Sequence, residues 1–240
     1  MEKQRLDQEM MSRGLVASRS QAESWIKLGK VKVNGKDVKK PGHFVYPDAK
    51  IKLDAKEQYV SRAGLKLASV AEALRLDFKG AIVLDVGSST GGFTDYALQH
   101  GAAKVVAVDV GTKQLHPTLH GHPHIELHEQ TDIRDLKKLS VAPTIVVIDV
   151  SFISLRDILP HVATLIEPKT QVVAMVKPQF EAGNSSKHKG VIKNASMRRD
   201  ILRDFESWAK HTFLIRAKSD SQVSGAKGNS ERFYLLSKLV

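Results

Sequence analysis

The chain has 240 residues, no cysteine and a net charge of +11, carried by 37 Lys and Arg against 26 Asp and Glu. This length accommodates one full α/β domain and a smaller module, because a typical domain has about 100 to 200 residues. The absence of cysteine excludes disulfides and thiolate metal sites. No apolar stretch approaches the roughly 18 residues that a membrane helix needs, and the polar start is unlike a secretory signal. We therefore expect a cytoplasmic protein that makes no use of a membrane.

The positive charge is unevenly distributed along the chain. Residues 1–58 hold 13 basic and 8 acidic residues, residues 59–176 hold 11 and 12, and residues 177–240 hold 13 and 6. A neutral middle between two basic segments is expected when the ends bind a polyanion and the middle binds a small molecule. Nucleic acid is the obvious polyanion. A solvated basic surface that only aids solubility is the alternative, which charge alone leaves open.

The first segment reads as a small α+β module. Leu6, Met10 and Met11 predict a short helix ending near Gly14, and a capping-box pattern at Ser20 predicts a second helix that ends at Gly29. Lysine and valine then alternate over residues 30–36 up to an Asn-Gly turn, which predicts a strand with one basic and one apolar face. Six basic residues are candidates for one phosphate-binding surface: Arg5, Arg13, Arg19, Lys27, Lys30 and Lys32. Ordinary surface charge is the alternative.

The middle of the chain carries a nucleotide-binding pattern. An apolar run over residues 81–84 leads into the glycine-rich stretch 85–95, and a second run over residues 104–108 ends in Asp109. A strand, a glycine turn opening a helix, and a second strand ending in a carboxylate describe one half of a nucleotide-binding α/β sheet.

The glycine spacing indicates which ligand this pattern suits. The glycines are Gly87, Gly91 and Gly92, so the middle glycine of the dinucleotide pattern is absent, and no phosphate-binding P-loop sequence occurs. The pattern suits a ligand without a pyrophosphate, such as S-adenosylmethionine, with its amino-acid end at the glycine loop and its ribose at Asp109. The alternative is an ordinary turn in which the glycines have only a backbone role.

Alternating strands and helices predict a doubly wound sheet. Strands are expected near residues 81–85, 104–109, 145–149 and 171–176, helices near 62–76, 91–100, 154–166 and 195–210, and two tail strands at 212–219 and 231–237. The tail pair predicts an antiparallel last strand. Ligands of such sheets bind at the carboxyl ends of the strands, where Asp85, Asp109, Asp149 and Lys177 lie. Asp149 and Lys177 are candidates for acid–base chemistry there, although each could also be a solvent-facing charge at a strand end.

Two other groups of residues were weighed for function. Histidines 116, 120, 122, 124 and 128 invite a metal hypothesis, but Pro117, Gly121 and Pro123 interrupt them, so we expect a loop beside the cofactor and no metal site. The basic residues Lys187, Arg198 and Arg199 are either RNA contacts or a solvated helix face, and the sequence leaves both open.

Residues 4–54 resemble the RNA-binding module named after ribosomal protein four of the small subunit. The matching stretches begin at Arg5, Arg13, Ser18 and Ile26, and the last is residues 48–53. Such modules grip structured RNA. The resemblance adds Ser18 and Gln21 to the predicted RNA contacts, and Arg62 follows at the start of the second domain.

The rest of the chain resembles the FtsJ-like ribosomal-RNA 2′-O-methyltransferases, and the two-domain chain looks like the TlyA family, whose members are often labelled hemolysins. The matching stretches are residues 59–67, 85–94, 108–115, 149–155, 176–181 and 228–234. The resemblance implies an RNA-binding domain over residues 1–57 and a methyltransferase domain over residues 58–240. The implied fold class is α/β, a Rossmann-like class I methyltransferase sheet, mostly parallel with an antiparallel last strand, preceded by a small α+β domain.

The resemblance also implies the activity and the site. The expected reaction is S-adenosylmethionine-dependent 2′-O-methylation of a ribose in ribosomal RNA, with a cytidine as the expected target, and with the large subunit favoured over the small by the short chain. The family's catalytic tetrad falls on Lys66, Asp149, Lys177 and Glu231. The implied cofactor contacts are Asp85, Gly87, Ser88, Thr90, Gly91, Gly92, Phe93, Asp109, Val110, Asp132, Ile133 and Asp149, with Asp132 at the adenine. No metal is required, because the leaving group is a neutral thioether.

Two other functions remain as alternatives. One is a non-catalytic RNA-binding or ribosome-assembly factor that keeps a vestigial cofactor fold. The other is a hemolysin acting on membranes, which the lack of an apolar spanning stretch disfavours. The sequence leaves the target nucleotide and the oligomeric state open.

Overall fold

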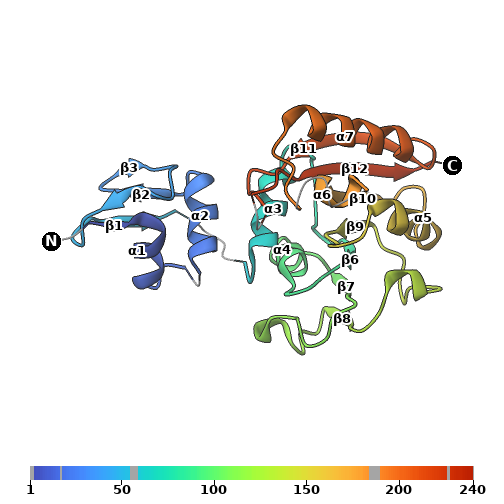
Figure 1. Cartoon of the computed structure of the whole chain (residues 1–240). Coiled ribbons are helices and arrows are strands. Elements are labelled where there is room, and N and C mark those ends of the chain that lie inside the picture. Colours follow the sequence, from blue (N-terminus) through green and yellow to red (C-terminus); the bar gives the residue numbers. More distant parts are fainter. Residues whose placement is uncertain (1–2, 17, 55–58, 184–189, 226–227, 240) are drawn as a thin grey trace.

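The computed structural model describes residues 3–16, 18–54, 59–183, 190–225 and 228–239. A small N-terminal module lies beside a larger α/β domain (Figure 1). The predicted domain boundary at residues 57 and 58 lies outside the described residues. Across the junction, the side chain of Gln21 donates to the carbonyl of Tyr59 at 3.4 Å. No described helix is long and apolar enough to cross a membrane.

Two helices and two small sheets build the N-terminal module. The helices are α1 (Leu6–Ser12) and α2 (Arg19–Lys27), and the strands are β1 (Gln4–Arg5), β2 (Val31–Val33), β3 (Lys36–Asp37), β4 (Phe44–Val45) and β5 (Ile51–Leu53). Strands β3, β2 and β5 form one sheet, and β1 pairs with β4 in the other. Val31 and Val33 are buried while Lys32 between them is not, which confirms the predicted two-faced strand.

Helix α2 begins earlier than the sequence pattern suggested. The hydroxyl of Ser18, not that of Ser20, accepts the hydrogen bond from the backbone N–H of Gln21, at 3.2 Å. The N-cap residue needs an extended backbone, and Ser18 has φ −151° and ψ 155° while Ser20 already lies within the helix. The predicted end of the helix is confirmed, because Gly29 follows it with a φ of +70°.

The larger domain is a seven-stranded sheet. Its strand order is β11-β12-β10-β9-β6-β7-β8. The strands are β6 (Ile82–Val86), β7 (Lys104–Val108), β8 (Ile125–His128), β9 (Ile145–Ile148), β10 (Gln171–Val176), β11 (Phe213–Asp220) and β12 (Arg232–Lys238). Strands β6 to β10 run parallel, and β12 runs antiparallel to both β10 and β11. This arrangement confirms the predicted fold class.

Helices bury both faces of the sheet (Figure 1). Helices α3 (Arg62–Ala71) and α4 (Gly92–Gln99) belong to the core on one face, and α5 (Leu155–Leu165) and α7 (Ala195–Ala209) to the core on the other. Successive strand residues alternate between these cores, as Val146 and Val147 do. A strand buried on both faces needs a continuous apolar run, which is why these strands could be recognised in the sequence. A short helix, α6 (Pro178–Glu181), follows β10.

Strand β8 is an element that the sequence analysis did not predict. We expected residues 116–128 to form a loop, but Ile125–His128 pairs with β7 as a parallel edge strand. The sequence Ile-Glu-Leu-His has no apolar run, and Leu127 is 39% exposed, because an edge strand is covered only in part. Its strand conformation therefore depends on hydrogen bonds to β7, which the local sequence does not reveal.

The close contact between α3 and α4 makes a testable prediction about stability. A Cβ added at Gly64 would lie 2.6 Å from the Tyr59 side chain and 3.0 Å from the carbonyl oxygen of Gly92. We expect Gly64→Ala to lower the free energy of unfolding by about 1–3 kcal/mol, as overpacking does, measured by urea denaturation. Gly42→Ala is the matched control, because the nearest atoms there belong to the flexible Arg5 side chain. Equal stability of the two variants would contradict this packing.

Candidate active site and cofactor cleft

Two adjoining cavities lie at the carboxyl ends of the parallel strands. The smaller has a volume of about 140 Å³ and the larger about 520 Å³, and both are lined by Gly87, Ser89, Asp149 and Ser151. Strand β6 lies between β7 and β9. Strands β7 and β8 extend the sheet on one side of β6, and β9 and β10 extend it on the other, so the strand order reverses at β6. Ligands of open α/β sheets bind at such a switch point.

The loop after β6 shapes the floor of both cavities. Gly87 has a φ of +81°, and a Cβ on it would lie 2.8 Å from the carbonyl oxygen of Asp149. No other residue fits that position without moving the backbone. At the rim, the carboxylate of Asp109 accepts hydrogen bonds from the backbone N–H groups of Ser89 (2.8 Å) and Gly111 (2.7 Å). Each oxygen keeps a lone pair for a further donor, such as a sugar hydroxyl.

Asp85 and Ser88 place unpartnered polar atoms beside the smaller cavity. Asp85 is fully buried, and its Oδ2 accepts a 2.6 Å hydrogen bond from the hydroxyl of Thr94. Its Oδ1 and the hydroxyl of Ser88 have no hydrogen-bond partner among the described residues. Burial raises the pKa of Asp85 to about 7, and the nearby charge of Asp149 adds to the shift. A buried carboxylate oxygen without a partner suits a cationic or hydrogen-bond-donating ligand.

Lys177 and Asp149 meet at the same cavity. Lys177 follows β10 and Asp149 follows β9, and Lys177 Nζ lies 2.5 Å from Asp149 Oδ1. The same Nζ donates to the hydroxyl of Ser151 at 2.8 Å. Lys177 is only 7% exposed, and it lines the smaller cavity together with Asp149 and the glycine loop. The two strand tips therefore converge on the glycine turn.

Lys66 and Glu231 form a second buried ion pair. Lys66 Nζ on α3 lies 2.6 Å from Glu231 Oε2, and the residues are 9% and 3% exposed. The antiparallel register pairs Val176 of β10 with Arg232 of β12. The next residues opposite each other are therefore Lys177, which follows β10, and Glu231, which precedes β12. The structure thus arranges the four predicted catalytic residues as two lysine–carboxylate pairs that the last, antiparallel strand brings to the same end of the sheet.

The other predicted cofactor residues divide into three groups. Thr90 and Phe93 line the smaller cavity, while Val110, Asp132 and Ile133 line the larger one. Gly91 and Gly92 line neither cavity. A side chain at Gly91 would collide with Leu115 and Leu119, and one at Gly92 would collide with Ser61 and Ala63. These two glycines therefore permit close packing of this loop, and their contact with the cofactor stays a prediction.

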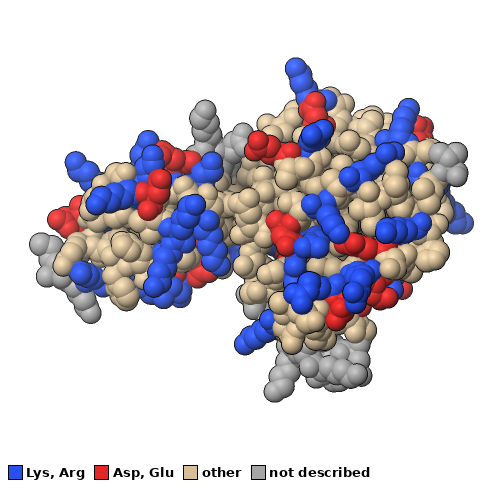
Figure 2. Space-filling view, turned by 90° about the horizontal axis from the view of Figure 1, so that it is seen from above, with Lys and Arg blue, Asp and Glu red and all other residues tan. Residues whose placement is uncertain are grey.

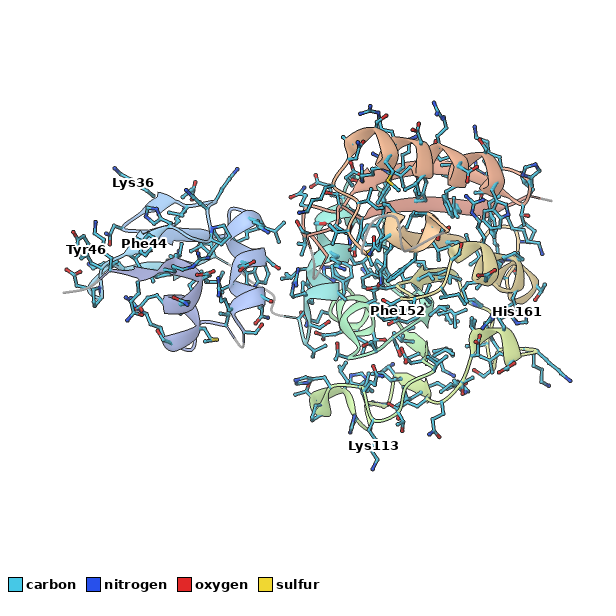
Figure 3. The ribbon with its side chains drawn as sticks, viewed as in Figure 1. Lys36, Phe44, Tyr46, Lys113, Phe152 and His161 are labelled. Carbon is cyan, nitrogen blue, oxygen red and sulfur yellow. The ribbon has the colours of Figure 1, made fainter. Side chains whose placement is uncertain are left out.

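Two residues of the site were not predicted from the sequence. Ser151 lines both cavities and binds Lys177, and its only sequence signal is its place in the stretch that follows Asp149. Phe152 lines the larger cavity, is 91% exposed, and has a φ of +64°. Its ring centroid is 5.2 Å from that of Phe180, and Figure 3 shows it on the methyltransferase domain. A bulky residue held at positive φ is strained, and such strain is concentrated at functional sites.

Several predicted RNA contacts have structural partners. The buried carboxylate of Asp7 accepts hydrogen bonds from Arg5 at 2.8 Å and from Arg19 at 2.9 Å. Arg13 binds Glu9 and the carbonyls of Pro47 and Ala49. The other predicted contacts also have partners within the chain: Ser18 caps α2, Gln21 donates to Tyr59, Arg62 donates to the carbonyl of Ser224, and Lys32 lies 3.5 Å from Asp54.

The predicted single phosphate-binding surface is therefore more divided than the sequence suggested. Lys27 and Lys30 are exposed, and Arg5 and Arg19 keep part of their side chains in solvent. Figure 2 shows Lys and Arg side chains over both domains on one face, with acidic residues between them. Arg198 is held by Asp220 at 2.6 Å and by the carbonyl of Ser230, whereas Arg199 is exposed. Lys187 lies outside the described residues.

Comparison with known proteins identifies the family. The family described as FtsJ-like methyltransferase matches residues 59–238, and the S4 domain matches residues 4–51. The chain belongs to the FtsJ-like methyltransferase family. The two cavities and the four paired residues therefore lie in the methyltransferase domain, and the basic module is the S4 domain. Within the described residues, no group of three His, Asp or Glu side chains is arranged to hold a metal ion.

Relatives of the whole chain share this two-domain organisation. The 16S/23S rRNA (cytidine-2′-O)-methyltransferase TlyA of Mycobacterium tuberculosis is 36% identical and covers 97% of this chain and 89% of its own length. The 23S rRNA (cytidine-2′-O)-methyltransferase TlyA of Campylobacter jejuni is 37% identical, with coverage of 93% and 96%. A solved structure from Streptococcus thermophilus, titled as a hemolysin, is 38% identical with a TM-score of 0.73 and covers 99% of this chain and 89% of its own. The predicted TlyA family membership is confirmed.

Asp85 makes the stability of the unliganded methyltransferase domain depend on pH. Its folded pKa of about 7 lies above its usual value of 3.8, so the unfolded chain releases the proton first as the pH rises. Its contribution to the free energy of unfolding is therefore complete below about pH 4 and is lost by about pH 7 to 8. Asp85→Asn should remove this loss, which is on the order of a few kcal/mol. Denaturant titrations of the original chain and the variant from pH 4 to 8 measure the free energy of unfolding. Parallel pH profiles for the two proteins would contradict the raised pKa of Asp85.

Proposed function

We propose that the chain methylates the 2′-hydroxyl of a cytidine in ribosomal RNA, with S-adenosylmethionine as methyl donor. The observation that carries the proposal is the buried Lys177–Asp149 contact at the smaller strand-tip cavity, together with the buried Lys66–Glu231 contact at the same end of the sheet. The relatives named above support the choice of substrate, since both are named for cytidine 2′-O-methylation and both names include 23S rRNA. We therefore propose large-subunit RNA as the target.

The residues of the cleft fit S-adenosylmethionine. When bound, it supplies a methyl group already activated on a sulfonium. Asp109 has acceptor capacity for the ribose hydroxyls, and Val110, Asp132 and Ile133 line the cavity suited to the adenine. Asp85 Oδ1 and the Ser88 hydroxyl, both without partners within the described residues, would bind the cationic amino-acid end. The larger cavity, about 520 Å³, has the size of an ordinary small-molecule site.

Lys177 is the residue proposed to act on the hydroxyl. A ribose 2′-hydroxyl is a poor nucleophile, so it must lose its proton or have its developing negative charge stabilised during attack. Nζ of Lys177, held by Asp149 and Ser151, is directed to do this at the smaller cavity. Asp149 orients the lysine and balances its charge. The proton of the hydroxyl is taken up within this pair, by Lys177 if its amine is neutral and otherwise by the carboxylate of Asp149.

Lys66 and Glu231 are proposed to hold the ribose. Both are buried, and their 2.6 Å contact places a donor and an acceptor together beside the start of β12. Each keeps further hydrogen-bonding capacity for sugar hydroxyls. Fixing the sugar in this way would align the attacking oxygen with the methyl group, which contributes to the rate by orientation. The S4 domain would hold a neighbouring part of the RNA through its cationic side chains.

Replacing Lys177 tests the proposed chemistry. Lys177→Met should lower the rate of methyl transfer to purified ribosomal large subunits by about 10²-fold or more, because the hydroxyl loses its proton acceptor or charge partner. Calorimetric binding of S-adenosylmethionine should survive. Lys169→Met, at an exposed lysine, is the matched control. Retained turnover in the Lys177 variant would remove this lysine from the mechanism, and a melting temperature for each variant separates loss of activity from loss of fold.

Replacing Phe152 tests how the nucleotide is held. We expect this exposed ring at the cleft to stack on a nucleobase near the reacting ribose. Phe152→Ala should therefore raise the KM for ribosomal RNA about fivefold or more, while binding of S-adenosylmethionine changes little. Phe152→Tyr keeps the ring and should restore the KM. Because the residue is 91% exposed at a φ of +64°, its loss should not lower the melting temperature. An unchanged KM in Phe152→Ala would rule out the stacking role.

A further inference from the structure

One face of the β1–β4 pair exposes two aromatic rings. Phe44 and Tyr46 are 59% and 52% exposed, whereas Val45 between them is 3% exposed. The two rings therefore extend from the same side of one chain segment, as alternate residues of a strand do. Figure 3 shows both on the S4 domain, with Tyr46 at the end that lies away from the methyltransferase domain. Neither ring contributes to the core of the module.

Each ring has a cation opposite it on β1. The antiparallel register pairs Arg5 with Phe44 and Gln4 with Val45, so Lys3 is the next residue opposite Tyr46. Nζ of Lys3 lies 4.6 Å from the centroid of the Tyr46 ring. The guanidinium of Arg5 lies near the turn that precedes β4, where a Cβ on Gly42 would be 3.2 Å from Arg5 Nη1. Two aromatic rings and two cations thus share one solvent-facing surface.

The partner of Arg5 holds its guanidinium in a fixed position. Arg5 donates two hydrogen bonds to Asp7, at 3.0 and 2.8 Å, and Asp7 is fully buried. The carboxylate that fixes the guanidinium is therefore hidden below the surface, while 37% of the arginine side chain remains exposed. A cation held in advance loses little conformational freedom when it binds an anion.

We propose that the face formed by Lys3, Arg5, Phe44 and Tyr46 binds unpaired nucleotides of an RNA. Bases stack on the two rings, and the neighbouring phosphates meet the two cations. An aromatic side chain can stack only on a base whose face is free, so the ligand is a loop, a bulge or a single strand, and not the interior of a duplex. The surface is a second RNA site, separate from the cleft where the reacting ribose binds. It deepens the proposed function, and its test does not depend on methyl transfer.

Charge favours RNA over a protein partner at this face. The first 58 residues carry 13 basic and 8 acidic residues, so the module is positively charged as a whole, and Lys3 places a cation directly beside the Tyr46 ring. Rings between cations match the alternation of bases and phosphates in a single strand. A protein partner would instead be expected to cover the rings with apolar side chains, which needs no cation beside each ring.

The test measures binding of an unpaired RNA to the full chain. The probe is an oligoadenylate of about eight residues with one central 2-aminopurine, whose fluorescence is quenched when it stacks. The double variant Phe44→Leu/Tyr46→Leu should bind the probe about fivefold more weakly or worse and should lose the quenching. The double variant Phe44→Tyr/Tyr46→Phe, which keeps both rings, should bind like the original chain. Leu214→Ala, at a similarly exposed apolar residue in the other domain, should have no effect.

Two results would overturn the proposal. The first is equal binding of the probe by the leucine variant and the original chain; if the same variant binds ribosomal subunits more weakly, the partner of this face is a protein. The second is an equal loss of binding to a blunt RNA duplex of about 16 base pairs, which would make the face a general cationic surface. Because Phe44 and Tyr46 are both exposed, the variants are expected to fold. The single variants Phe44→Leu and Tyr46→Leu test each ring separately. If methyl transfer proves absent, binding of the probe still decides this inference.

Discussion

The contact between Lys177 and Asp149 is the interaction on which the site depends. The two residues follow adjacent parallel strands, and their side chains meet at 2.5 Å with little exposure to solvent. Removing either partner leaves a buried charge uncompensated, which is strongly destabilising in a protein interior. Strands β9 and β10 must therefore end at the same level, and the loops that follow them must turn back toward the glycine loop. The close approach of Gly87 to the carbonyl of Asp149 fixes the third side of this arrangement.

Glu181 holds the two loops in register. It lies at the end of α6, just after Lys177, and its carboxylate accepts hydrogen bonds from the hydroxyl of Ser154 (2.7 Å) and from the backbone N–H of Leu155 (2.8 Å). These groups belong to the start of α5, just after the Asp149 loop. Burial raises the pKa of Glu181 above its usual range, with the hydrogen bonds opposing the shift. One buried carboxylate therefore ties together the segments that carry Lys177, Asp149 and Phe152.

The S4 domain shows the same principle on its surface. Asp7 is fully buried and orients both Arg5 and Arg19, so cations that would otherwise move freely have set positions. The cleft and this module are joined through the contact of Gln21 with Tyr59, and Tyr59 also lies against Gly64 of α3. Helix α3 carries Lys66. The S4 domain is thus attached to the helix that supplies one of the four residues of the site.

The sequence by itself determined the central strands, the helices between them and the polar residues at the strand ends. Doubly buried parallel strands require continuous apolar runs, and parallel strands end at one edge, so Asp85, Asp109, Asp149 and Lys177 had to lie near each other. Only the tertiary structure decided which side chains pair. Lys66 meets Glu231 because β12 runs antiparallel to β10, and Ile125–His128 is a strand because β7 offers its edge. Gly91 and Gly92 serve packing, and Arg5 binds Asp7, because partners distant in the chain occupy the adjacent space. Such contacts depend on burial and on distances between remote segments, and no local pattern of residues contains that information.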